Sequence, residues 1–210
     1  MLFRLEVLPT AVFAAVILCW FIFAGIFLFR RKLSPAPETR RENISLFGLA
    51  LQGLAYAIVC LVRRQPFTLP FPTSRAIEVI IAIVIIGAAG ISAWLATAAV
   101  RTLGKEWSLA ARLVEGHKLI TAGPYRFVRN PIYTAMFGML LATGLAISRW
   151  SALIGAVLVF AIGTRMRIRS EEKLLREGFG PEFEAYARSV PALVPRLSGF
   201  TTKSVGGGLF

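Results

Sequence analysis

Several residue types that build metal and redox sites are scarce in this chain of 210 residues. It contains no aspartate, one histidine and two cysteines, and charged residues make up only 17%. Cys19 and Cys60 each lie inside an apolar stretch, and His117 has no partner ligands at a spacing typical of zinc or haem sites. We therefore expect no metal site and no disulfide framework.

Hydrophobic residues, by contrast, are abundant. They account for 56% of the chain, with a mean hydropathy of +0.68, whereas soluble domains contain about 45–50%. Lys and Arg outnumber Glu by 24 to 11. Because the apolar runs contain almost no ionisable side chains, charged loops at a membrane surface explain this excess better than nucleic acid binding. We expect membrane lipids around the chain and no nucleic acid partner.

Five apolar stretches predict the fold. At about 1.5 Å per residue, a helix of about 20 residues crosses a hydrocarbon core of about 30 Å. The last two stretches are shorter, and the short segment between them predicts a tight helical hairpin. We therefore predict an all-α, polytopic transmembrane helix bundle of about five spans, with a cytoplasmic helical segment at the C-terminal end. The expected spans are 9–29, 44–62, 76–100, 132–147 and 151–163.

Charged and small residues refine this arrangement. Arg30, Arg31 and Lys32 follow the first stretch as a stop-transfer cluster, which indicates a retained helix and not a cleaved signal peptide. Small residues at 87–93 predict that the third helix packs centrally. Five spans place 19 of the 24 Lys and Arg on one side. The positive-inside rule puts that side in the cytoplasm and the N-terminus outside.

Two polar segments, 101–131 and 165–197, carry most of the remaining ionisable residues. In the first, Asn130 and Pro131 are well suited to begin a helix. The free N–H groups at that helix end, next to Arg129, would hold a carboxylate. The alternative is a basic surface loop that binds anionic lipid headgroups.

The second polar segment contains the adjacent residues Glu171 and Glu172. Neighbouring residues of a helix point about 100° apart, so at most one of these carboxylates can face a given cavity. Pairing of Arg167 with Glu171 in an exposed extension of the fifth helix is the simpler explanation of these charges. Residues 179–186 and 190–195 predict a short amphipathic helix that turns back and covers part of the molecule.

Two blocks of sequence in these segments form a known pattern. The first joins G-K-E-W-S to the run G-H-K-L-I-T-A-G-P-Y-R-F-V-R-N-P-I-Y, and the second joins the Glu pair to later Leu, Phe-Gly, Tyr and Val-Pro positions. Together they resemble the isoprenylcysteine carboxyl methyltransferase family over about residues 76–197. The blocks occupy 104–108, 116–133 and 171–195.

The resemblance implies an integral-membrane methyltransferase that uses S-adenosylmethionine without a Rossmann domain. The resemblance covers a methyltransferase-like core that encloses the cofactor (76–197). The apolar runs predict two N-terminal transmembrane helices with their loops before it (1–75), and the composition of the last residues predicts a disordered tail after it (198–210). The cofactor-binding residues that the resemblance implies are His117, Leu119, Gly123, Tyr125, Arg129, Asn130, Pro131, Tyr133, Glu171 and Glu172.

Catalytic roles are expected for Arg129, Tyr133 and Arg167. Methyl transfer from a sulfonium is a one-step displacement, in which the protein supplies proximity and orientation. A carboxylate is a nucleophile at neutral pH without a base. We expect the two arginines to orient a carboxylate of the cofactor or the acceptor, and Tyr133 to pack near the adenine or methylsulfonium. The family usually has His where this chain has Asn130, and Asn cannot titrate, so no base is expected there.

A lipophilic acceptor that enters from the bilayer fits this architecture, most simply a carboxylate as in isoprenylcysteine carboxyl methylation. The alternatives are a phospholipid or amine N-methyltransferase, an NADPH-dependent enzyme like a sterol reductase, and a non-enzymatic lipid-binding membrane protein. For the methyltransferase, we expect Arg129→Ala and Glu172→Ala to reduce cofactor binding or turnover with little change in thermal unfolding.

Overall fold

The computed structural model describes residues 7–29, 38–41, 44–64, 74–104, 112–114 and 119–195. Its helices are α1 (Val7–Phe29), α2 (Ile44–Leu61), α3 (Arg75–Leu103), α4 (Pro131–Ile147), α5 (Trp150–Phe179), α6 (Pro181–Ser189) and the 3₁₀ helix η2 (Gly123–Arg126). β1 (Glu38–Arg41) and β2 (Arg112–Val114) pair as a two-stranded antiparallel ribbon. The predicted helical bundle is confirmed, and the ribbon is a small addition to it.

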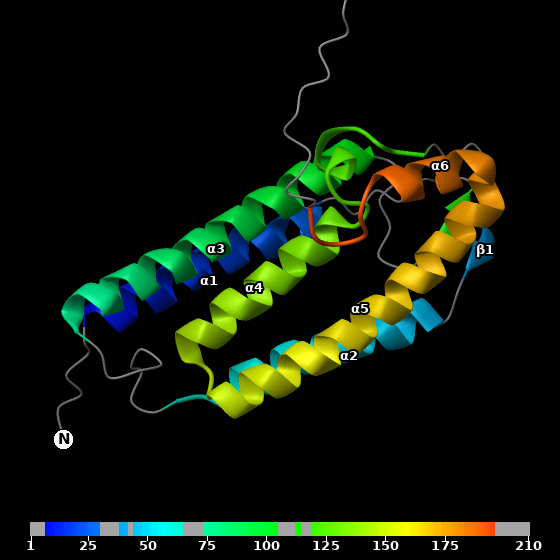
Figure 1. Cartoon of the computed structure of the whole chain (residues 1–210). Coiled ribbons are helices and arrows are strands. Elements are labelled where there is room, and N and C mark those ends of the chain that lie inside the picture. Colours follow the sequence, from blue (N-terminus) through cyan, green and yellow to red (C-terminus); the bar gives the residue numbers. More distant parts are fainter. Residues whose placement is uncertain are drawn as a thin grey trace, which may run out of the picture.

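Helix α4 occupies the centre of the bundle, with α1 and α3 packed on one side and α2 and α5 on the other (Figure 1). One cluster of buried side chains joins α1, α3 and α4, and a second joins α2, α4 and α5. Small residues of α3, such as Ala89 and Ala93, contribute to the first cluster. The prediction that α3 is central is wrong, because α3 packs mainly against α1 and α4 and lies on the outside of the bundle with α1 (Figure 1).

Within the described residues, four helices are long and apolar enough to cross a membrane, namely α1, α2, α3 and α5. Helix α4 has 17 residues, about 25 Å at 1.5 Å per residue, and is shorter than a full crossing. Helix α5 has 30 residues, so it continues far beyond the predicted end at Gly163 into the second polar segment. These helices make the chain an integral membrane protein.

The predicted hairpin between α4 and α5 is confirmed, since Ser148 and Arg149 alone separate the two helices. Its turn is joined to the end of α2, where the amide of Arg64 donates to the carbonyl of Ile147 at 2.9 Å. The Arg64 guanidinium donates to two carbonyls of the last turn of α4, at 2.8 and 3.1 Å. These bonds satisfy carbonyls that have no partner inside the helix, so α2, α4 and α5 are tied together at this end.

The polar segments gather at the opposite end of the bundle (Figure 1). The last turn of α3, η2, the start of α4, the end of α5 and α6 lie together there. The division of the chain after residue 75 stays a prediction, although α2 packs along α5 and so belongs to the same bundle. The tail at 198–210 lies outside the described residues.

Candidate functional site

Helix α6 folds back over the polar end because the chain reverses at Gly180. The φ angle of this residue is +50°, a left-handed conformation that glycine adopts without steric cost. Beyond α6, the amides of Arg129 and Asn130 donate to the carbonyls of Pro191 (2.8 Å) and Ala192 (3.1 Å). The two polar segments are therefore joined, and α6 is the short returning helix that the sequence predicts.

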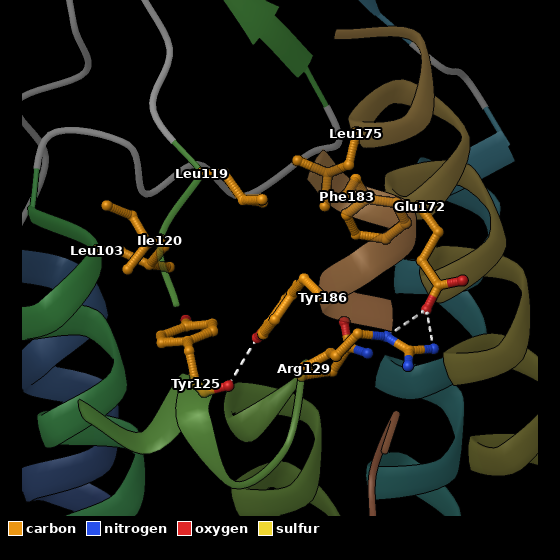
Figure 2. A pocket seen from close by; sticks show the side chains of 10 residues that line it. Leu103, Leu119, Ile120, Tyr125, Arg129, Glu172, Leu175, Phe183 and Tyr186 are labelled. Atoms are coloured by element: carbon orange, nitrogen blue, oxygen red, sulfur yellow. Dashed lines mark hydrogen bonds and ion pairs between the residues drawn. The ribbon is translucent and has the colours of Figure 1, made fainter. Parts of the chain in front are cut away.

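A pocket lies between the joined segments (Figure 2). Aliphatic and aromatic side chains form most of its wall, while Arg129, Asn130 and Glu172 supply charged and polar groups. Its walls come from the end of α3, residues 119–130, α5 and α6. The lining residues are Leu103, Leu119, Ile120, Tyr125, Arg129, Asn130, Glu172, Leu175, Phe183 and Tyr186.

Arg129 and Glu172 form an ion pair in the pocket wall (Figure 2). Nε and Nη2 of Arg129 donate to Oε1 of Glu172 at 3.1 and 2.7 Å. Nη1 of Arg129 donates to the carbonyls of Ala187 and Val190 at the end of α6. Both charged side chains are largely buried, with 14% and 12% of their surface exposed. The carboxylate that Arg129 orients in this structure is therefore that of Glu172, and most of its donors are engaged within the protein.

Glu171 points away from the pocket, into the helix bundle. Its Oε1 accepts a hydrogen bond from the Tyr133 hydroxyl and lies 3.8 Å from Nη2 of Arg167. The guanidinium carbon of Arg167 lies 5.1 Å from the centre of the Tyr133 ring, a cation–π arrangement. The expected divergence of the two glutamates is confirmed. The predicted pairing of Arg167 with Glu171 is also present, but the predicted exposure is wrong, because Arg167 is only 4% exposed.

Two tyrosines of the pocket are linked directly: the Tyr186 hydroxyl donates to the Tyr125 carbonyl at 2.6 Å (Figure 2). Burial raises the pKa of Tyr186 to about 12, against the opposing positive charge of Arg129. Burial also raises the pKa of Tyr125, and the negative charge of Glu171 raises it further. Both phenols are therefore neutral at physiological pH, and they offer hydrogen bonds and aromatic surface but no base.

Half of the predicted cofactor-binding residues line the pocket: Leu119, Tyr125, Arg129, Asn130 and Glu172. Tyr133 and Glu171 lie behind it, together with Arg167. We call Tyr133, Glu171 and Arg167 the inner network. Of the three residues predicted to be catalytic, Arg129 lies in the pocket wall, and Tyr133 and Arg167 lie in the inner network. His117 lies outside the described residues.

The remaining predicted residues shape the backbone around the pocket. Gly123 has a φ of +58°, and a Cβ there would lie 2.8 Å from Oγ1 of Thr102, so the close approach of η2 to α3 requires glycine. Pro131 is the first residue of α4 and Asn130 precedes it, as predicted. The Asn130 side chain does not cap the helix, however, and instead donates to the Ala192 carbonyl at 3.1 Å. It thereby holds the C-terminal segment in place.

The predicted site omits five pocket residues. Phe183 and Tyr186 lie three residues apart on α6, and this spacing on an amphipathic helix is the signal that could have identified them. Leu175 lies three residues after Glu172 on α5, on the same helix face, so the spacing from Glu172 could have indicated it. Leu103 and Ile120 carry no such signal, because their place depends on how the end of α3 meets the chain before η2.

Comparison with known proteins assigns the chain to a family. The sequence pattern of the phospholipid methyltransferases matches residues 78–182, which is half of the chain. The protein-S-isoprenylcysteine O-methyltransferase of Schizosaccharomyces pombe is 30% identical over 106 residues, covering 50% of this chain and 45% of that protein. A probable protein-S-isoprenylcysteine O-methyltransferase of Oryza sativa subsp. indica is 33% identical over 99 residues, covering 46% and 52%.

A further relative is named for metal resistance and not for methyl transfer. The nickel-cobalt-cadmium resistance protein NccN of Alcaligenes xylosoxydans xylosoxydans is 38% identical over 106 residues, covering 49% of this chain and 48% of that protein. In the part of the chain that the structure describes, no three His, Cys, Asp or Glu side chains lie together as a metal site would require. The chain spans about half the length of the curated relatives it matches. By the match over residues 78–182, the protein belongs to the phospholipid methyltransferase family, and it is similar to the isoprenylcysteine O-methyltransferases.

Proposed function

We propose that this protein is an integral-membrane methyltransferase that transfers a methyl group from S-adenosylmethionine to a carboxylate on a lipophilic acceptor. The observation that carries the proposal is the pocket between the two polar segments, in which Arg129 fixes the buried carboxylate of Glu172. Membership of the family supports methyl transfer. The names of the isoprenylcysteine O-methyltransferases among the relatives support a carboxylate as the acceptor.

The side chains of the pocket fit S-adenosylmethionine in kind. Tyr125, Phe183 and Tyr186 offer aromatic surfaces to an adenine ring and to a positively charged sulfonium. Glu172 offers carboxylate oxygens to an ammonium group or to ribose hydroxyls. The enclosed space is about 80 Å³, small beside the ~300–1,000 Å³ of pockets that surround a whole ligand. These walls therefore hold one part of the cofactor.

The residues around the pocket bind and orient, and none of them needs to act as a base. The cofactor supplies an electrophilic methyl group when it is bound. Arg129 holds Glu172 and the end of α6 in fixed positions. Tyr133 and Arg167 hold Glu171 on the side of the pocket that faces the bundle. Because a carboxylate acceptor is already ionised at neutral pH, orientation of the two reactants is the main contribution required of the protein.

The position of the pocket fits an acceptor that keeps its tail in the bilayer. The outer surfaces of α3 and α5 are apolar, with exposed side chains such as Ile83, Trp94 and Leu158. An acceptor held by lipid would need to present only its polar head to the end of the bundle. The excess of Lys and Arg on this end supports a cytoplasmic location by the positive-inside rule, and a water-soluble cofactor is available in the cytoplasm.

An amine is the second candidate acceptor, because the family that matches is described as phospholipid methyltransferase. The two acceptors differ in their dependence on pH. An amine must lose a proton before it attacks, so its rate of methylation rises with pH towards its pKa of about 10. Methylation of a carboxylate is nearly constant between about pH 6 and 9, since the acceptor is ionised throughout this range.

Binding and transfer can be tested separately on the full chain purified in detergent. By calorimetry, we expect S-adenosylhomocysteine to bind, Glu172→Gln to weaken that binding, and NADPH not to bind. Membranes given a radiolabelled methyl donor should then yield a labelled lipid extract. Base treatment releases the label from a methyl ester and leaves it on a methylated amine. Binding of NADPH alone would indicate a reductase, and binding of neither compound would indicate a lipid-binding protein.

A further inference from the structure

Helices α2 and α5 lie in direct backbone contact. A Cβ added to Gly48 of α2 would lie 2.7 Å from the carbonyl oxygen of Gly163 and 2.6 Å from Cγ of Arg167. A Cβ added to Gly163 would in turn lie 2.7 Å from the carbonyl oxygen of Gly48. In lipid, small residues allow helices to approach in this way. The approach brings α2, which precedes the matched region 78–182, against the part of α5 that leads to the site.

The same contact places a polar side chain of α2 inside the bundle. Gln52 is fully buried, with no exposed surface. Its Nε2 donates to Oγ1 of Thr164 at 2.8 Å, and its Oε1 accepts from Nη1 of Arg167 at 3.1 Å. Both partners lie on α5. Because the amide nitrogen and the amide oxygen of Gln52 both form hydrogen bonds, the side chain is held in one orientation. It therefore fixes the orientation of the Arg167 guanidinium that it contacts.

Arg167 lies between Gln52 and the site. Its other side faces Glu171, at 3.8 Å, and the ring of Tyr133. Glu172, on the pocket wall, follows five residues later on α5, about 7.5 Å along the helix axis. Arg167 is therefore at a deeper level in the bundle than the pocket. An ionisable side chain at such a level is costly in a membrane and commonly serves function.

Gln52 is suited to hold a functional arginine because it is uncharged. It supplies an acceptor to Nη1 of Arg167 without adding a second negative charge next to that of Glu171. Among the described residues, the carboxylate that pairs with Arg167 is that of Glu171, at 3.8 Å. A carboxylate of an acceptor that comes from the bilayer would still be attracted to this guanidinium.

We infer that Gln52 is a positioning residue for methyl transfer: from α2, it orients Arg167 towards the carboxylate of the acceptor. This inference rests on the proposed function. It assigns to α2 a part in the site, beyond that of a membrane anchor. It also separates two roles, since Glu172 and the pocket serve the cofactor while Gln52 and Arg167 serve the acceptor.

The test compares three variants of the full chain in detergent. Gln52→Leu removes both hydrogen bonds at a similar volume, and Gln52→Glu keeps an oxygen that accepts from Arg167. Thr164→Val removes a partner of Gln52 and leaves the bond to Arg167. The measurements are kcat and KM for a lipophilic carboxylate acceptor such as a prenylated cysteine, the Kd for S-adenosylhomocysteine by calorimetry, and the midpoint of thermal unfolding.

For Gln52→Leu, we expect kcat/KM for the acceptor to fall about 10–100-fold, as misplacement of an orienting group does, while the Kd for S-adenosylhomocysteine stays within about twofold. Gln52→Glu should retain more activity than Gln52→Leu, and Thr164→Val should remain close to the wild type. Unchanged kinetics in Gln52→Leu would overturn the inference, as would parallel losses of activity, ligand binding and unfolding midpoint. Failure of the wild-type protein to bind S-adenosylhomocysteine would instead overturn the proposed function.

Discussion

Arg129 and Glu172, which are 43 residues apart in the sequence, meet through a single carboxylate oxygen that accepts from both Nε and Nη2 of the arginine. The same guanidinium also donates to two carbonyls at the end of α6. Removal of this side chain would leave several buried acceptors without donors, which costs more than the bonds themselves contribute. Arg129 is thus a brace between α4, α5 and α6 as well as part of the pocket wall.

We expect Arg129→Ala to lower the free energy of unfolding by about 3–5 kcal/mol, because it removes the buried partner of the Glu172 carboxylate and leaves two carbonyls at the end of α6 without their donor. This revises the expectation from the sequence that thermal unfolding would hardly change. Arg176→Ala is the matched control, since Arg176 also pairs with Glu172, at 3.2 Å, but is 47% exposed. Arg176→Ala should lower the free energy of unfolding by only about 0–1 kcal/mol. Thermal unfolding in detergent measures both, and equal losses would contradict the bracing role.

The two adjacent glutamates should differ in what they affect. Glu172→Gln changes the pocket wall, so we expect weaker binding of S-adenosylhomocysteine, by about 10-fold for the loss of a charged hydrogen-bonding partner. Glu171→Gln changes the inner network, so we expect lower turnover of the acceptor with nearly unchanged binding of S-adenosylhomocysteine. Calorimetry and steady-state kinetics on the two variants provide the measurement. The assignment fails if both variants lose the same property.

Helix contacts predict opposite outcomes for substitutions at two glycines of α5. Gly163→Ala would place a Cβ 2.7 Å from the Gly48 carbonyl oxygen, and we expect it to destabilise the protein by about 1–3 kcal/mol. Gly155→Ala, earlier on α5, meets no described atom within 4 Å. There we expect no loss, or a gain of up to about 1 kcal/mol from better helix propensity. The unfolding midpoints should therefore move in different directions, and a similar fall in both would argue against the close α2–α5 contact.

The raised pKa of Tyr186 predicts how stability depends on pH. Its pKa is about 12 in the folded protein and about 10 in the unfolded chain. The folded state therefore binds this proton more tightly, so the contribution is complete below about pH 10 and is lost as the pH rises towards 12. We expect the unfolding midpoint to fall over this interval and to fall less in Tyr186→Phe. Ser189→Ala, which removes an exposed hydroxyl on the same helix, should behave like the wild type.

The apolar runs predict the helices well, because a membrane requires long uncharged segments and imposes this on the sequence. The extent of α5 is the exception. The hydropathy of α5 falls at Arg165, Arg167 and Arg169, but the backbone stays helical through these residues and beyond them. The central place of α4 was also missed, since the order of helices in a bundle depends on contacts between distant segments. Small residues indicate close packing but do not identify the partner helix.

The motif blocks predict the pocket in part, because the residues that bend and join the chain lie close together in the sequence. Gly123, Asn130 and Pro131 are of this kind. Gln52 could not have been found in this way. It is the only amide side chain in an apolar helix without charged residues, and its partner Arg167 is 115 residues away. A polar residue buried in a span indicates that a partner exists, but only the structure identifies the partner.

Part of the pocket wall comes from α6, which follows the apolar helices that the structure describes. Phe183 and Tyr186 of α6 line the pocket, and the bonds from Arg129 and Asn130 to Pro191 and Ala192 hold the segment after α6 in place. During biosynthesis the bundle can thus enter the membrane before any complete binding site exists. A nascent chain, or one that ends before α6, would be inserted in the membrane without activity, and the enzyme would become active only after α6 and residues 190–192 had been made.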